Sequence, residues 1–140
     1  MRDSGRLVWL VIFVSIAAAG LVAGCAPAPP PKPGPVRVDA SADGTTVSLK
    51  VGQTLEVALP GNVTTGYDWG INGMLPSQVT TVTDSYESTA PSGVVGAGGV
   101  RTFVYTAVTP GTGTLRLMYS RSFEEGVAPS KVFNLTVVVQ

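Results

Sequence analysis

The residues best suited to chemistry in this sequence form a short polar stretch, Gly61–Trp69, which reads GNVTTGYDW. Asn62 and the two glycines of this stretch accept positive φ angles, so the backbone is predicted to turn sharply there. Thr64 and Thr65 add stiff, hydroxyl-bearing side chains of little bulk. We expect a narrow, projecting tip that suits entry into a cleft of another protein, and that is a poor shape for building a cleft of its own.

Two further segments do not look like ordinary turns. Residues 93–99 read GVVGAGG and end in the run Gly96, Ala97, Gly98 and Gly99. Residues 119–124 read YSRSFE and contain Arg121, Ser122 and Phe123. Glycines allow another backbone to approach closely, and an arginine next to an aromatic residue offers hydrogen bonds and apolar contact. Both segments are therefore candidate recognition surfaces.

The composition argues against most kinds of active site. The sequence has no histidine and one cysteine, which excludes Ser-His-Asp and Cys-His sites, histidine-based metal sites and internal disulfides. Nine basic and nine acidic residues leave no net charge, which argues against a nucleic-acid partner. A carboxylate-based hydrolase stays open as an alternative, with candidates Asp68, Asp84, Glu87, Glu124 and Glu125. We expect a binding protein and not an enzyme, with no metal and no cofactor.

Residues 1–24 have the features of a secretory signal. Arg2 and Arg6 precede an apolar run over residues 7–24, and small residues lead directly to Cys25. The sequence LVAGC resembles a bacterial lipobox, whose cysteine is lipidated and becomes the first mature residue. An uncleaved transmembrane helix is the alternative, because the run is just long enough to span a bilayer. Both readings make the rest of the chain extracytoplasmic, and the first anchors it to the bacterial cell membrane as a lipoprotein through Cys25.

Residues 25–35 contain the lipidation candidate and a proline-rich linker, APAPPPKPGP, which is too poor in bulky apolar residues to fold. At ~3.1 Å per residue, this linker would hold the next domain roughly 30 Å from the lipid. The remaining residues, 36–140, are enough for one two-layer domain without disulfides.

Apolar and polar residues alternate along much of this domain, which predicts half-buried β-strands. The expected strands cover residues 47–51, 55–59, 67–71, 79–86, 100–109, 115–120 and 132–139. About seven to eight short antiparallel strands, separated by Pro and Gly turns, indicate an all-β, immunoglobulin-like β-sandwich. Trp69 is expected to pack in its core. The three polar segments then join alternate pairs of strands, so they should emerge at the same end and form one edge.

Taken together, the three segments resemble those of the chagasin family of cysteine-peptidase inhibitors. That family has an Asn-Pro-Thr-Thr-Gly loop followed by an aromatic residue and Trp, then a Gly-x-Gly-Gly loop, then a Tyr-x-Arg-Pro-Trp loop. The corresponding residues here are Asn62, Val63, Thr64, Thr65, Gly66 and Tyr67 with Trp69, then 96–99, then 119–123. The resemblance covers residues 41–140. Val63 stands in place of the family proline, and Ser122 and Phe123 stand in place of Pro-Trp.

The resemblance implies a reversible, tight-binding inhibitor of papain-like cysteine peptidases that has no enzymatic activity. The tip Thr64–Gly66 would enter the peptidase cleft, with residues 96–99 along one wall and Arg121 and Phe123 along the other. Replacing Trp by Phe123 would weaken binding by about 1 kcal/mol. We expect a monomer. The alternative is a non-inhibitory, immunoglobulin-like surface lipoprotein that binds other partners, and only the loops distinguish the two.

Overall fold

The computed structural model describes residues 33–91, 94 and 96–140. The predicted signal sequence, Cys25 and most of the proline-rich linker lie outside the described residues, so these assignments stay predictions. Among the residues described, no helix has the length and apolar character needed to span a membrane. Every residue of the buried hydrophobic core falls between Leu49 and Val139, so the described part carries its own core.

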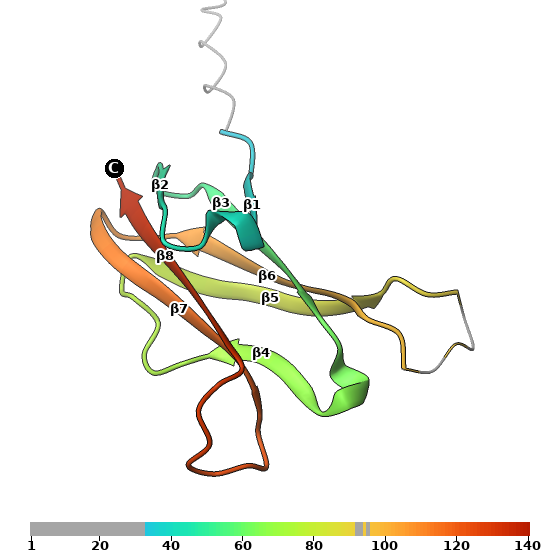
Figure 1. The fold of residues 1–140 in the computed structure, drawn as a ribbon. Helices are drawn as coiled ribbons and strands as arrows, with labels where there is room; N and C mark the ends of the chain where they lie inside the picture. Colours follow the sequence, from blue (N-terminus) through green and yellow to red (C-terminus); the bar gives the residue numbers. More distant parts are fainter. Residues whose placement is uncertain (1–32, 92–93, 95) are drawn as a thin grey trace, which may run out of the picture. The chain divides into compact units, whose positions relative to one another are not determined.

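Eight strands and two single turns of 3-10 helix make up the domain. They are β1 (Val36–Asp39), η1 (Ala40–Ala42), β2 (Thr46–Leu49), β3 (Thr54–Gly61), η2 (Val63–Thr65), β4 (Tyr67–Ile71), β5 (Val79–Ser88), β6 (Gly99–Ala107), β7 (Gly111–Arg121) and β8 (Lys131–Val139). The strands form two sheets of four, in the orders β1-β3-β6-β5 and β2-β8-β7-β4 (Figure 1). The predicted all-β sandwich is confirmed.

The sheets are mixed, which differs from the expected purely antiparallel arrangement. β1 runs parallel to β3 and β2 runs parallel to β8, whereas the other neighbouring strands are antiparallel. The turn η1 carries the chain from an edge of the first sheet to an edge of the second, so β1 and β2 do not form hairpins with the strands that follow them. β1 was not predicted, and Val51, expected in a strand, lies in the turn after β2 and is 50% exposed.

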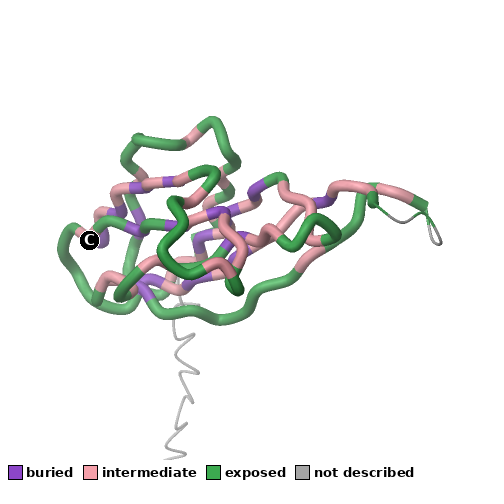
Figure 2. The backbone as a smooth tube through the Cα atoms, turned by 60° about the horizontal axis from the view of Figure 1, so that its bottom comes forward, coloured by how far each residue is buried: buried purple, intermediate pink, exposed green. Residues whose placement is uncertain are grey.

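The core consists of the residues that face inward from both sheets. Buried and less buried positions alternate along β3, β7 and β8, as the period of two predicts. Figure 2 shows the buried positions along the strands and the exposed ones mainly in the connections. Trp69 and Tyr119 are buried in this core, which confirms the expected place of Trp69.

The three segments of interest follow β3, β5 and β7, and we call them loop 1 (residues 62–66), loop 2 (89–98) and loop 3 (122–130). β3 and β5 both run antiparallel to β6, and their ends, Gly61 and Ser88, both pair with Gly99. Because β1 is parallel to β3, the chain enters β1 at the opposite end, where the Gln53 amide donates to the carbonyl of Gly34 at 2.8 Å. In Figure 1 the loops lie at the end away from β1 and the C-terminus.

Candidate functional site

Loop 1 is a closed turn held by its own side chains. Asn62 caps the turn η2, and its side-chain oxygen accepts hydrogen bonds from the Thr64 N–H at 3.1 Å and the Thr64 hydroxyl at 2.6 Å. The Thr65 hydroxyl donates to the Asn62 carbonyl at 2.6 Å, and the Gly66 N–H donates to the Val63 carbonyl at 3.0 Å. Thr64, Thr65 and Gly66 are exposed. The predicted tip is therefore present and preformed.

Only one residue of loop 1 uses a left-handed conformation. Gly66 has φ 81° and ψ −6°, whereas Asn62 is extended, with φ −143°. Sequence reasoning expected Asn62 to help the chain turn by accepting positive φ. Instead, Asn62 acts through its side chain, as a helix-capping residue does, by accepting bonds from donors that the short turn leaves unpaired.

Loop 2 lies directly beside loop 1. The Asn62 side-chain amide donates to the Gly96 carbonyl at 3.0 Å, so one side chain fixes both loops. A Cβ placed on Gly98 would lie 3.4 Å from the Gly61 carbonyl oxygen. Gly96 is exposed, whereas Ala97 and Gly98 are half-buried. Residues 96–98 of loop 2 therefore present mainly backbone beside loop 1.

Gly99, the last residue of the predicted glycine motif, is the first residue of β6 and is buried. A Cβ at this position would come within 2.3 Å of the Glu87 carbonyl oxygen and 2.6 Å of the Tyr86 ring. No side chain fits there without moving β5. Close packing of β5 against β6 is by itself enough to require glycine at this position.

Loop 3 lies against the other side of loop 1. The Arg121 Nε donates to the Thr65 carbonyl at 3.2 Å, and its Nη1 bonds Glu124 at 2.8 Å. The bond to Glu124 raises the pKa of Arg121, so its charge is held. The Phe123 ring is 70% exposed and would lie 3.1 Å from a Cβ on Gly66. The resemblance assigns Arg121 to contact with a partner, and within this chain its bonds tie Thr65 of loop 1 to Glu124 of loop 3.

A column of aromatic rings supports these loops from below. Tyr119 lies between Tyr67, on which it stacks, and Trp69, to which it is tilted, with ring centroids 5.4 and 5.2 Å away. The Tyr119 hydroxyl accepts from the Asn62 N–H at 2.7 Å, and the Arg121 guanidinium lies 4.4 Å from the Tyr67 ring centroid. Tyr67 is half-buried in this column, so much of its side chain packs beneath the loops and only part of it reaches the exposed edge. Sequence reasoning missed the role of the Tyr119 hydroxyl, which no local pattern reveals.

Three of the five candidate carboxylates of the hydrolase alternative are engaged in ion pairs. Asp68 and Asp84 both pair with Arg101, and Glu124 pairs with Arg121. The hydrogen bond with Asp68 raises the pKa of Arg101. Within residues 33–91, 94 and 96–140, no three His, Cys, Asp or Glu side chains gather as a metal site would require. Since Asp68, Asp84 and Glu124 are held in ion pairs, the arrangement gives no support to a hydrolase that uses them for acid–base work.

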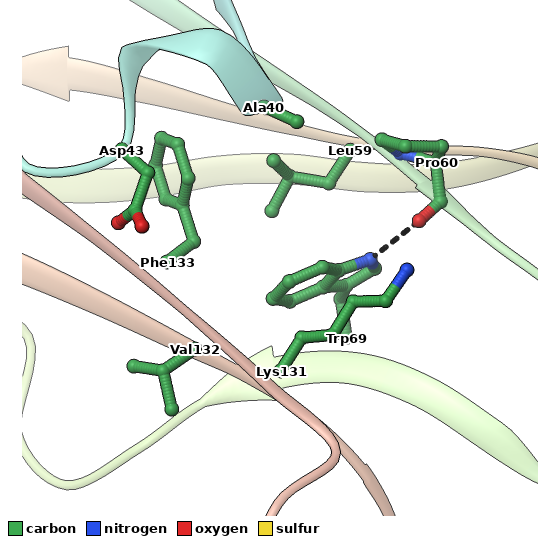
Figure 3. A pocket seen from close by; sticks show the side chains of 8 residues that line it. All are labelled: Ala40, Asp43, Leu59, Pro60, Trp69, Lys131, Val132 and Phe133. Carbon is green, nitrogen blue, oxygen red and sulfur yellow. Dashed lines mark hydrogen bonds between the residues drawn. The ribbon is translucent and has the colours of Figure 1, made fainter.

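A hollow of about 320 Å³ opens beside the site, between the two sheets (Figure 3). Leu59, Trp69 and Phe133 form apolar parts of its wall, and Lys131 lies on its lining as well. The Trp69 indole N–H donates to the Pro60 carbonyl at 3.0 Å, as the dashed line in Figure 3 shows. A second hollow of about 270 Å³ lies mainly along the ends of β4 and β7 next to loops 1 and 3, and is lined by Gly66, Asp68, Trp69, Gly70, Ser120 and Ser122.

Comparison with known proteins shows the family of this chain. The family model described as "Chagasin family peptidase inhibitor I42" matches residues 48–137, well over half of the chain. The chain belongs to the chagasin family of peptidase inhibitors. Members of this family are inhibitors and not enzymes, so the predicted resemblance and the absence of enzymatic activity are both confirmed.

Individual relatives of this chagasin-family chain agree in sequence and in fold. Amoebiasin-1 of Entamoeba histolytica is 34% identical over 100 residues, which are 70% of this chain and 93% of that protein. Chagasin of Trypanosoma cruzi is 31% identical over 88 residues, covering 61% and 80%. The crystal structure of the cysteine protease inhibitor EhICP2 from E. histolytica has a TM-score of 0.70 and 27% identity, and the match covers 79% of this chain and 99% of that one.

Proposed function

We propose that this domain is a reversible, tight-binding inhibitor of papain-like cysteine peptidases. Its family and its likeness to a solved cysteine protease inhibitor support inhibition of this peptidase class. The observation that carries the mode of binding is the joining of three loops into one edge. Asn62 bonds loop 1 to loop 2, and Arg121, the last residue of β7, bonds Thr65 of loop 1 and Glu124 of loop 3. The exposed tip Thr64–Gly66 stands between the other two loops.

The tip is shaped to fill a narrow cleft. Its side chains are small, and its backbone is a closed turn with a bond between Gly66 and Val63. An extended segment would lie along a peptidase cleft as a substrate does, whereas a closed turn enters it end-on. Because the internal bonds of Asn62 already fix the turn, little conformational entropy is lost on binding.

The flanking loops would contact the walls of the cleft on either side of the tip. Loop 2 offers exposed backbone at Gly96, which a flat wall can approach closely. Loop 3 offers the exposed ring of Phe123, and aromatic residues are common anchors of protein interfaces. Arg121 contributes mainly by holding these groups in place through Thr65.

Titration of papain with residues 33–140 tests this proposal. We expect one-to-one loss of peptidase activity. Thr64→Arg should weaken inhibition about tenfold or more, because a long side chain overfills a narrow cleft. The matched control is Thr112→Arg, since Thr112 is exposed at the start of β7. No inhibition by the unaltered domain at micromolar concentration would contradict the proposal and favour the non-inhibitory binding module.

We also propose that Cys25 is lipidated and anchors the domain outside the cytoplasmic membrane. The lipobox-like sequence before Cys25 and the proline-rich linker after it support this. The entry of the chain into β1 at the end opposite the loops agrees with it, because a tether there leaves the loops unobstructed. Labelling with a radioactive fatty acid should mark the protein, and Cys25→Ala should abolish the label. Label that survives Cys25→Ala would contradict lipidation at this residue.

A further inference from the structure

Arg101 is a charged residue in a position that the fold would otherwise fill with an apolar one. It shares a face of β6 with Phe103, Tyr105 and Ala107, all of which are buried. Its side chain is only 17% exposed. Moving a charge out of water is costly unless it is paired and hydrogen-bonded, so its partners decide what it does there.

The partners of Arg101 lie on two strands that belong to different sheets. Its Nε and Nη2 donate to the two carboxylate oxygens of Asp68 on β4, the Nε bond being 3.0 Å long, and its Nη1 donates to Asp84 on β5 at 3.1 Å. The guanidinium carbon also lies 5.7 Å from the ring centroid of Tyr86. β4 and β5 are edge strands of separate sheets and share no backbone ladder. Arg101 thus joins two edges that no backbone pairing connects.

This ion cluster lies at the base of loops 1 and 2. Asp68 is two residues beyond the loop 1 residue Gly66, and Arg101 is two residues beyond Gly99, the first residue of β6 after loop 2. Tyr86 packs against Gly99, and its hydroxyl lies 3.5 Å from the Gly61 carbonyl oxygen, next to the start of loop 1. The cluster therefore fixes the position at which the chain leaves loop 1 relative to the position at which it leaves loop 2.

We propose that Arg101, with Asp68 and Asp84, sets the spacing between loops 1 and 2 and is a positioning residue for inhibition. It acts through the loops and does not contact the peptidase. The planar guanidinium bonds both oxygens of one carboxylate and reaches a second carboxylate, which fixes direction as well as distance. A lysine carries the same charge on a single nitrogen and cannot reproduce this fork. The inference rests on the proposed inhibitory function.

The test compares Arg101→Lys, Arg101→Met and Asp68→Asn in residues 33–140. The matched control is Arg37→Met, which breaks the ion pair of Arg37 with Glu56, 2.6 Å long, between β1 and β3. Three quantities are measured for each variant: the free energy of unfolding, the inhibition constant against papain, and 15N relaxation at the Gly66 and Gly98 amides. Unfolding shows which variants are folded, and relaxation reports loop order without a peptidase.

We expect both Arg101 variants to raise the inhibition constant by about two- to thirtyfold. The Gly66 and Gly98 amides should become more mobile, although the domain stays folded. In the double variant Arg101→Met/Asp68→Asn, the loss of inhibition should be smaller than the sum of the two single losses, because both changes disrupt the same Arg101–Asp68 pair. Arg37→Met should change neither inhibition nor relaxation.

The inference is overturned if folded Arg101→Lys and Arg101→Met inhibit papain as the unaltered domain does and leave the two amides as ordered. It is also overturned if inhibition falls only in proportion to the unfolded fraction. If the unaltered domain does not inhibit papain, the proposed function fails. The relaxation data then decide separately whether Arg101 orders the loops, because that measurement needs no peptidase.

Discussion

Replacing Gly66 by alanine tests whether the shape of the tip is what binds. Gly66 has φ 81°, and an alanine in this left-handed region costs ~1–2 kcal/mol. The added Cβ would also lie 3.1 Å from the Phe123 ring, but that ring is 70% exposed and can move aside at small cost. The backbone strain is therefore the main effect.

The strain can appear in either of two measurements. If the turn keeps its conformation, the free energy of unfolding falls by about 1 kcal/mol, after part of the strain is offset by the lower chain entropy of unfolded alanine. This would lower Tm by about 4–8 °C. If the turn relaxes instead, stability is kept, but restoring the tip on binding weakens inhibition by about five- to thirtyfold. The loss in free energy of unfolding and the loss in free energy of binding should together amount to about 1 kcal/mol or more.

Gly73→Ala is the matched control. Gly73 has φ 84° and no atom within 4 Å of a Cβ placed on it, so it carries the same backbone strain without a neighbour. Its connection, between β4 and β5, is not one of the three loops. We expect it to lower stability while leaving inhibition of papain unchanged. Urea denaturation and papain titration check both variants, and the reasoning is refuted if Gly66→Ala alters neither quantity or if Gly73→Ala weakens inhibition equally.

Three further substitutions probe the interior and the base of the loops. Tyr105→Phe should raise the free energy of unfolding by about 1 kcal/mol, because the buried Tyr105 hydroxyl has no hydrogen-bond partner among the described residues; a loss of stability in urea would contradict this. Tyr119→Phe should lower the free energy of unfolding by about 1 kcal/mol, since it leaves the Asn62 N–H unpaired, and should weaken papain inhibition. Asn62→Asp keeps the acceptor for Thr64 but sets a carboxylate against the Gly96 carbonyl. We therefore expect Asn62→Asp to weaken inhibition while the turn persists. An unchanged papain titration would show that the bond between loops 1 and 2 does not determine the strength of inhibition.

The sequence by itself determined the fold class and most of the strands. Side chains of a half-buried strand alternate between solvent and core, so β3, β7 and β8 are visible as a period of two. β1 has only four residues, VRVD, too few for the pattern to stand out. Its parallel pairing with β3 depends on where η1 carries the chain, and no local pattern contains that information.

The sequence also determined which segments to consider as a site, because their residue types are unusual for turns. The tertiary structure alone decided how those segments fit together. The Asn62 N–H meets the Tyr119 hydroxyl across 57 residues of sequence, and Arg101 meets Asp68 across 33. Contacts of this kind depend on how two sheets pack, so Arg101 and Tyr119 look unremarkable in the sequence. Arg101 and Tyr119 lie at the base of the edge, whereas its exposed tip could be predicted from six consecutive residues, 62–67.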